Sequence, residues 1–200
     1  GELRQLAEMI GSAERITVFC GIGAREAHDE VVRLAAMLKA PVAYTFKAKM
    51  EVQYDNPYEI GMTGLLGLPS AYGAMHESDL LLLLGTDFPY DCFLPSECRI
   101  AQVDIRPERI GRRARVELGL AGDVKDTLQA LLPMLRERSD RTFLDRQLKI
   151  YRALCDDMAA VASKRGSTGN IAPEYVATLI DSLASDSAIF TVDTGMCCVW

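Results

Sequence analysis

A turn that carries hydroxyl, carboxylate and aromatic side chains follows the most apolar run of the chain. Five consecutive leucines, Leu80–Leu84, are followed by Gly85, Thr86, Asp87, Phe88, Pro89 and Tyr90. A short run that is wholly apolar and bounded by turn residues predicts a strand buried on both faces of a parallel sheet. Open α/β sheets bind ligands just beyond the carboxyl ends of such strands. The segment 85–90 therefore predicts the site of a nucleotide-like ligand.

Two glycine-containing segments could place backbone N–H groups around a phosphate. Gly21–Ala24 (GIGA) lies between a predicted strand and a predicted helix, where the helix N-terminus favours anions. It departs from the dinucleotide-binding fingerprint, because Glu26 stands where a third glycine or alanine is expected. A tight strand-to-helix turn explains this segment about equally well. Thr63–Gly67 (TGLLG) could approach a phosphate or a planar ring closely, although an ordinary flexible loop is slightly favoured.

Asp104 and a group of arginines could each have one of two roles. Asp104 closes a predicted strand, where its carboxylate could accept two ribose hydroxyls or cap the turn that follows. Arginines 106, 109, 112, 113 and 115 could contact phosphates or a neighbouring subunit, but a solvated loop face is the commoner outcome. The sequence contains no GxSxG motif, and neither His28 nor His76 has a triad context. The pattern predicts a ligand-binding α/β domain with no catalytic residues of its own.

Hydrophobic periodicity predicts the elements that must hold these segments. A strand, a helix and a strand open the chain, and such units imply a parallel sheet with right-handed crossovers. Predicted strands cover 15–20, 41–45, 80–84, 99–104 and 115–120. Predicted helices cover 2–12, the residues after Gly23 up to Leu38, 70–77, the residues after a cap at Asp123, and a polar stretch from Asp140 to about Ser163. Residues 46–69 are irregular and rich in glycine, and predict a long functional loop.

The polar stretch 163–171 predicts a linker between two parts of the chain. Residues 1–162 are expected to form the first domain. Beyond the linker, Pro173 begins another predicted helix and Ala188–Asp193 (AIFTVD) predicts a strand. Because the pattern breaks off at Trp200, residues 172–200 are expected to be the truncated start of a second α/β domain.

Composition narrows the function classes. A formal net charge of −6 over 200 residues argues against nonspecific nucleic-acid binding. No run approaches transmembrane length and no secretory leader is visible, so a cytoplasmic protein is expected. The six cysteines form no CxxC pair and only two histidines accompany them, so no metal site is expected.

Four segments of the chain, taken together in order, carry a family resemblance. They are YDNPYEIGMTGLLG (54–67), DLLLLLGTDFPY (79–90), AQVDIRPERIG (101–111) and GDVKDTLQALLP (122–133). They resemble the central domain of thiamine-diphosphate-dependent enzymes of the pyruvate oxidase and acetolactate synthase group, most closely the bacterial branch that oxidises pyruvate and reduces quinone. The tail AIFTVDTGMCCVW (188–200) resembles the start of that family's diphosphate-binding domain.

The resemblance implies a fold, a cofactor and its contacts. The fold would be a six-stranded parallel sheet flanked by helices, which in the oxidase branch binds FAD with the adenine end over the sheet. The FAD contacts carried over by position are Thr63, Gly64, Leu65, Leu66, Thr86, Asp87, Phe88, Pro89, Tyr90 and Asp104, with Gly21 and Gly23 as less supported additions.

The resemblance also implies an activity for the complete enzyme. That enzyme would decarboxylate pyruvate on thiamine diphosphate and pass electrons through FAD to quinone, as a homo-tetramer. The family's catalytic glutamate belongs to an amino-terminal domain, and its motif for Mg²⁺ and diphosphate lies beyond Trp200, so this chain is expected to have no turnover by itself. Membrane attachment in the quinone-reducing branch uses a carboxyl-terminal segment, which leaves peripheral membrane association open.

Two alternatives compete with this interpretation. One is a structural middle domain, which keeps the fold but binds no FAD and serves only subunit packing. The length of the 46–69 loop and its glycines favour the FAD-binding domain over it. The other is an NAD-dependent dehydrogenase, which the imperfect glycine fingerprint disfavours.

Overall fold

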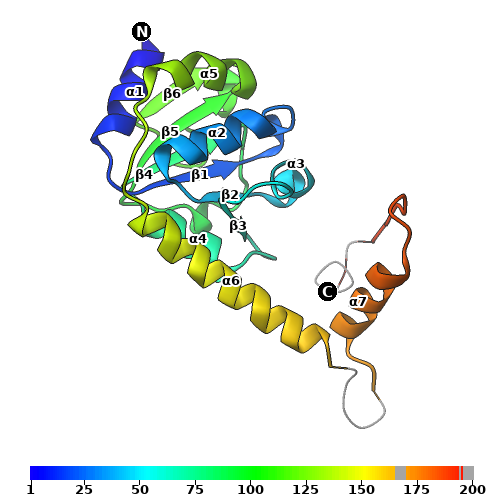
Figure 1. Ribbon diagram of the computed structural model, residues 1–200. Coiled ribbons are helices and arrows are strands. Elements are labelled where there is room, and N and C mark those ends of the chain that lie inside the picture. The colour runs from blue at the N-terminus through cyan, green and yellow to red at the C-terminus, as the bar shows by residue number, and fades with distance from the viewer. Residues whose placement is uncertain (165–169, 194, 196–200) are drawn as a thin grey trace. The chain divides into compact units, whose positions relative to one another are not determined.

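A computed structural model describes residues 1–164, 170–193 and 195, and divides the chain into two compact units, 1–151 and 152–200. Each unit is described by itself. The first contains an all-parallel sheet of six strands flanked by helices, which confirms the predicted fold (Figure 1). The predicted boundary after residue 162 and the linker 163–171, of which 165–169 lie outside the described residues, stay predictions.

The sheet has the strand order β3-β2-β1-β4-β5-β6. Its strands are β1 (Ile16–Cys20), β2 (Val42–Tyr44), β3 (Glu59–Met62), β4 (Leu80–Leu84), β5 (Arg99–Asp104) and β6 (Leu118–Ala121). The leucine strand β4 lies at the centre, and Val18 and Ala101 flank Leu82 in register. Since all strands run in one direction, their carboxyl ends meet at one edge of the sheet.

The five leucines of β4 build two hydrophobic layers at once. Successive side chains of a strand point to opposite faces, so Leu80, Leu82 and Leu84 lie in one buried cluster while Leu81 and Leu83 lie in the other. All five are at most 3% exposed. This double burial explains why the run lacks the polar alternation of a strand with one solvent face.

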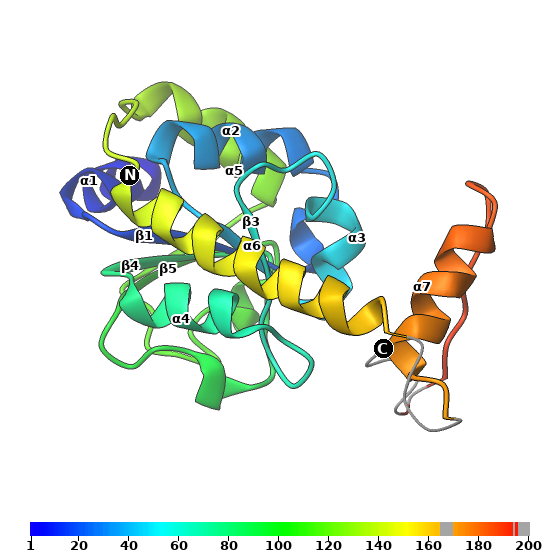
Figure 2. The ribbon, with the colours of Figure 1, turned by 60° about the horizontal axis from the view of Figure 1, so that its bottom comes forward.

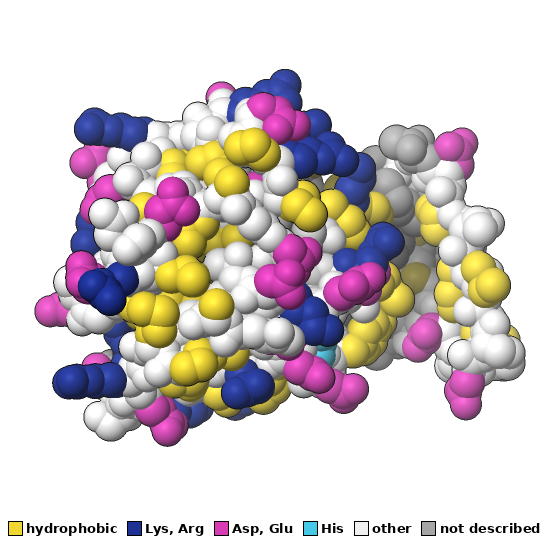
Figure 3. All heavy atoms as spheres, turned by 90° about the horizontal axis from the view of Figure 1, so that it is seen from above, with side chains coloured by type: hydrophobic (Ala, Val, Ile, Leu, Met, Phe, Trp, Pro, Cys, Tyr) yellow, Lys and Arg dark blue, Asp and Glu magenta, His cyan; other side chains and the backbone are white. Residues whose placement is uncertain are grey.

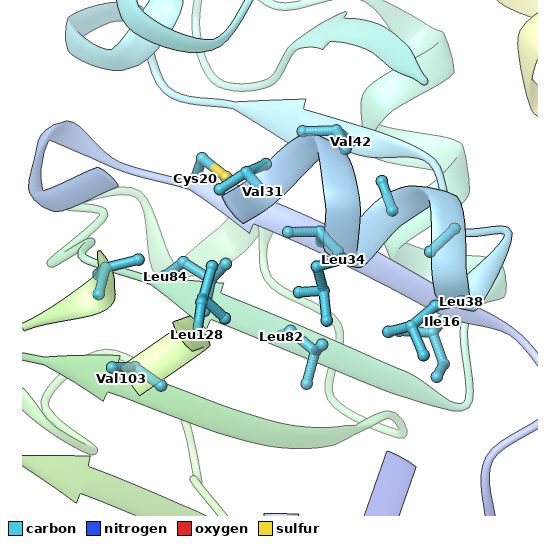
Figure 4. Close-up of a cluster of buried hydrophobic side chains, with 14 of the residues drawn as sticks. Ile16, Cys20, Val31, Leu34, Leu38, Val42, Leu82, Leu84, Val103 and Leu128 are labelled. Carbon is cyan, nitrogen blue, oxygen red and sulfur yellow. The ribbon is translucent and has the colours of Figure 1, made fainter. Parts of the chain in front are cut away.

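Three helices cover the face to which Leu82 points. They are α1 (Glu2–Ser12), α2 (His28–Leu38) and α5 (Val124–Leu131). Figure 4 shows Val31, Leu34 and Leu38 of α2 lying over Ile16, Leu82 and Val42 of the sheet. Asp123 caps helix α5, and its Oδ1 accepts the N–H groups of Lys125 at 2.8 Å and Asp126 at 3.2 Å. This is the predicted cap.

The opposite face is covered by α4 (Pro69–Glu77) and by the first turns of α6 (Thr142–Ala162), as Figures 1 and 2 show. Two side chains from these turns of α6, Leu144 and Leu148, are buried. Glu59 of the edge strand β3 links β2 to α6, because its carboxylate accepts hydrogen bonds from Tyr44 at 2.7 Å and Tyr151 at 2.8 Å. Burial, followed by the nearby Glu59, raises the pKa of Tyr44 far above its ordinary value.

The prediction of an irregular loop over 46–69 is wrong in part. It contains the short helices η2 (Phe46–Ala48) and α3 (Lys49–Val52), and then β3, the sixth strand of the sheet. Strand β3 is short and pairs only with β2, with a shift of register between Val42 and Tyr44. The last strand, predicted at 115–120, lies at Leu118–Ala121.

The second unit contains α7 (Pro173–Leu183), which starts at the predicted proline. The strand predicted at 188–193 is not formed, and Ile189 is 90% exposed. A strand needs a neighbouring strand to pair its backbone groups, and the described part of this unit supplies none. Thr194 and the residues after Gly195, to which part of the predicted tail pattern belongs, lie outside the described residues.

Charge is evenly mixed on the face shown in Figure 3, where lysine and arginine lie interspersed with aspartate and glutamate. None of the helices in the described part of the chain could span a membrane.

Candidate functional site

The strand order reverses between β1 and β4, which defines the switch point at which open α/β sheets form a crevice for ligands. Gly21 and Gly23 follow β1 there, and Gly85 follows β4. The N–H of Gly21 donates to the Leu84 carbonyl at 2.8 Å, and the N–H of Gly23 donates to the Gly85 carbonyl at 3.0 Å. These two amides are therefore used inside the protein.

Glycine is required at this junction by close backbone approach. A Cβ on Gly21 would lie 2.4 Å from the Gly85 oxygen, and one on Gly23 would lie 2.7 Å from the Gly85 Cα. The chain then makes a single 3₁₀ turn, η1 (Ile22–Ala24), and α2 begins only at His28. The expectation that Gly21–Ala24 opens a helix directly is wrong, because the glycines pack the two loops together instead.

The second glycine segment, Thr63–Gly67, forms a tight turn at the carboxyl end of β3. The N–H of Gly67 donates to the Gly64 carbonyl at 2.9 Å. Gly64 has φ +119°, and a Cβ there would lie 3.4 Å from the Phe88 ring and 3.7 Å from the Tyr90 ring. The structure thus brings together two of the predicted contact segments, 63–66 and 86–90, although they follow different strands.

Thr63 has an unusual polar environment. The side chain is 4% exposed, yet its Oγ1 finds no hydrogen-bond partner among the described residues. Leaving a buried hydroxyl unpaired costs roughly 1–3 kcal/mol. A buried hydroxyl at the carboxyl edge of the sheet that lacks a protein partner is the kind of group that a bound ligand can satisfy.

Aromatic rings pack against one another within and beneath the 86–90 segment, on the side of the hydrophobic core. Phe88 is 4% exposed, and its ring packs edge-to-face on Phe19 at 5.2 Å and on Tyr90 at 5.5 Å between centroids. Phe88 therefore belongs to the hydrophobic core, while Tyr90 and Pro89 reach solvent. Phe88 thus packs against Tyr90 and lies next to the backbone of Gly64.

Asp87 and three arginines form a cluster that we call the arginine clasp: Asp87, Arg109, Arg112 and Arg113. Asp87 Oδ2 accepts hydrogen bonds from Arg109 Nη1 and from Arg112 Nη1, the latter at 3.2 Å, and Oδ1 accepts one from Arg113 Nε at 3.2 Å. The carboxylate is thus shared by three guanidinium groups from the loop between β5 and β6. Sequence analysis named all four residues but not their pairing.

Gln102 holds the same loop and was missed by the sequence analysis. From the buried strand β5, its amide donates to the carbonyls of Thr86 at 3.1 Å and Arg109 at 3.3 Å, and accepts the N–H of Gly111 at 2.9 Å. A glutamine between the apolar residues Ala101 and Val103 of a buried strand was the signal, because buried polar side chains are almost always paired.

Asp104 ends β5 and is 7% exposed. Its Oδ1 accepts the N–H of Arg106 at 2.9 Å, so the carboxylate caps the turn that follows. This capping is one of the two roles expected for Asp104, and binding of ribose hydroxyls stays a prediction.

The charge state of Asp87 makes the clasp sensitive to acid. Burial raises the pKa of this carboxyl, but hydrogen bonds and charges from Arg109 and Arg113 outweigh burial and hold the pKa below its ordinary value. A lowered folded pKa stabilises the fold above the unfolded pKa of about 3.9, and the contribution is lost as the pH falls through the folded pKa.

Asp87→Asn is therefore expected to lower the free energy of unfolding by roughly 1 kcal/mol at pH 5–7, discounted because the arginines are partly exposed. Urea unfolding should show the difference from wild type shrinking below about pH 4. Asp91→Asn, on an exposed neighbour, is the control and should change little. A difference that persisted unchanged to about pH 3 would contradict this assignment.

Large apolar side chains line the carboxyl edge of the sheet. Each of the loops that follow β1 to β5 exposes at least one, and five of them are between 38% and 70% exposed: Ile22, Phe46, Leu65, Tyr90 and Ile105. Soluble domains expose such groups together mainly at binding sites. Among the described residues, no group of three or more His, Cys, Asp or Glu could hold a metal ion.

Residues 3–131 match the sequence model of a family described as "Thiamine pyrophosphate enzyme, central domain". A putative thiamine pyrophosphate-containing protein, YdaP of Bacillus subtilis, is 31% identical over all of this chain and 34% of its own length. An uncharacterized 42.6 kDa protein of Pseudomonas amyloderamosa is 53% identical over 74% of this chain and 37% of its own.

Two enzymes with named activities are more distant. The pyruvate oxidase of Lactiplantibacillus plantarum is 26% identical over 96% of this chain and 32% of its own length. The acetolactate synthase of Mycobacterium avium is 28% identical over 100% of this chain and 33% of its own. The chain thus spans about a third of the length of these curated relatives.

Proposed function

The chain belongs to the thiamine pyrophosphate enzyme family, of which it contains the central domain, and from this premise we propose that it binds FAD at the carboxyl edge of its sheet. The complete protein would oxidatively decarboxylate pyruvate with thiamine diphosphate and Mg²⁺, and pass electrons through FAD to quinone. The likeness to a pyruvate oxidase supports this activity. FAD would supply the electron relay, and thiamine diphosphate would bind outside this chain.

The buried, unpartnered hydroxyl of Thr63 is the observation that carries the proposal. Thr63 precedes Gly64, where an added Cβ would lie 3.4 Å from the Phe88 ring and 3.7 Å from the Tyr90 ring. The exposed apolar side chains along the same edge suit a planar ring system. Thr63, Gly64 and Tyr90 would hold the cofactor, and Asp104 would accept its ribose hydroxyls.

Thr63→Val tests this proposal, because it removes the hydroxyl and keeps the shape of the side chain. No protein hydrogen bond of Oγ1 is lost among the described residues, so stability without FAD should not fall. The dissociation constant for FAD in the intact protein, followed by flavin fluorescence, should rise about fivefold to tenfold, as for one lost hydrogen bond.

Thr17→Val is the matched control. The hydroxyl of Thr17 is also buried, but it donates to the Ala74 carbonyl at 3.1 Å and accepts from Ser78 at 2.6 Å. This variant should lose roughly 1–3 kcal/mol of stability without a selective loss of FAD affinity. Unchanged FAD affinity in Thr63→Val would remove Thr63 from the site, and an intact protein that takes up no FAD would refute the proposal.

A second candidate function is that of a structural middle domain in an acetolactate-synthase-like or decarboxylating relative, with no functional FAD. The internal use of the Gly21 and Gly23 amides favours it, since these donors have acceptors within the protein. The likeness to an acetolactate synthase also favours it. A visible spectrum of the gently purified intact protein separates the two, because only the flavoprotein shows flavin bands that pyruvate bleaches.

The full-length protein would form a homo-tetramer. It would be located in the cytoplasm, where it could associate peripherally with a membrane. Quinone would be the electron acceptor. No interaction with nucleic acid is expected from the net charge of −6. Sedimentation of the intact protein measures the oligomer, and quinone-dependent oxidation of pyruvate measures the acceptor.

A further inference from the structure

The arginine clasp contains more positive charge than its single carboxylate neutralises. Asp87 faces Arg109, Arg112 and Arg113, so two positive charges remain uncompensated within the cluster. The described residues offer these three guanidinium groups no other carboxylate acceptor. Such a surplus at one point attracts an anion that carries at least two negative charges.

The guanidinium groups keep donors for such an anion. Each carries five N–H groups in a rigid fork, and each gives one of them to Asp87. Their side chains are 32%, 51% and 32% exposed, whereas the carboxylate of Asp87 is only 14% exposed. A ligand can therefore reach the arginines from solvent while Asp87 holds them from the inner side.

The clasp is held in place before any ligand arrives. The side-chain amide of Gln102 makes three hydrogen bonds that connect Thr86, Arg109 and Gly111. It donates to the carbonyls of Thr86 and Arg109, and its oxygen accepts the N–H of Gly111. The cluster lies beyond the carboxyl ends of β4 and β5, the edge at which α/β sheets bind phosphorylated ligands. A preorganised group of donors loses less entropy on binding.

We propose that Arg109, Arg112 and Arg113 form a binding site for a phosphate or diphosphate group, and that the carboxylate of Asp87 competes with this ligand for the same donors. Arginine forks pair with phosphate oxygens as they pair with a carboxylate. Asp87 then acts as an internal counter-ion. The site goes beyond the proposed FAD contacts, in which Asp87 would itself touch the cofactor and its loss would weaken binding.

Titration of the flavin-free intact protein with inorganic pyrophosphate tests the site by calorimetry. EDTA is present so that a metal-dependent diphosphate site elsewhere does not contribute. Asp87→Asn removes the competing charge and should bind pyrophosphate roughly tenfold tighter than wild type. Arg113→Gln should bind it several-fold more weakly. Arg115→Gln, an equal change of charge on an exposed arginine of the same loop, should match wild type.

Equal or weaker binding by Asp87→Asn, or a loss in Arg115→Gln as large as in Arg113→Gln, would overturn the proposal. Arg112→Gln separates a loss of binding from a folding defect. Arg112 is the most exposed of the three arginines, so this variant should fold fully and still bind pyrophosphate more weakly. If saturating FAD abolishes the pyrophosphate response, the natural ligand is the diphosphate of the dinucleotide. If both bind together, it is a separate phosphate compound. A protein that binds pyrophosphate in this way but takes up no FAD would keep this site and refute the flavin proposal alone.

Discussion

Replacing Gly85 with alanine is expected to lower the free energy of unfolding by about 4 kcal/mol, among the largest effects of single substitutions. Gly85 has φ +63°, which an alanine adopts only with strain. The added Cβ would also lie 2.5 Å from Gly23 Cα and 2.6 Å from its carbonyl carbon. Because both are backbone atoms, no side chain can rotate away, and β1 and β4 must move apart.

Gly111→Ala separates the two causes. Gly111 has a similar φ of +73°, but a Cβ there would meet no atom within 4 Å. This variant should lose only the conformational part, about 1 kcal/mol. Urea unfolding of both variants measures the difference, and equal losses would show that the backbone contact between Gly23 and Gly85 contributes nothing.

Leu81→Ala is expected to lower the free energy of unfolding by about 2–5 kcal/mol, because it leaves a cavity at a fully buried position in the central strand. Leu81 lies in the cluster with Phe19, Met75 and Leu148, so it links the sheet to α4 and α6. The surrounding side chains come from different elements and relax only partly into the cavity. The denaturant midpoint should fall with an unchanged slope.

Leu65→Ala makes the same chemical change on a side chain that is 70% exposed, and should shift the midpoint little. A comparable loss in both variants would contradict the central position of Leu81. A reduced slope in Leu81→Ala would instead show that the two layers unfold separately, which the sharing of β4 between both clusters argues against.

The central part of the fold could be predicted because its signals are local. The run Leu80–Leu84 is apolar throughout and is bounded by turn residues, and Asp123 caps the helix that follows it with its side chain. Strand β3 was hidden because Glu59–Met62 is short, contains a glycine and gains its strand conformation only by pairing with β2. The six-strand count came from the family resemblance.

The candidate site was predictable in position but not in pairing. Parallel strands place their following loops at one edge, so 63–66 and 86–90 could be expected to lie there. The sequence could not show that Asp87 meets arginines more than twenty residues away, nor that the Gly21 and Gly23 amides are used internally. Both depend on how loops pack across the sheet, which no local pattern encodes.

Hydrogen bonds also continue one residue beyond the strands at this edge. Thr63 donates to Tyr44, Thr45 to Cys20, Gly21 to Leu84 and Gly85 to Val103. The first residue of each of these loops therefore still belongs to the sheet, and an exchange of loops can begin only at the second residue, with Gly23 kept after β1 because it packs against Gly85. Loops exchanged between relatives at that second position should transfer ligand preference while the scaffold stays intact, which makes this edge a natural place for recombination and for engineered grafts.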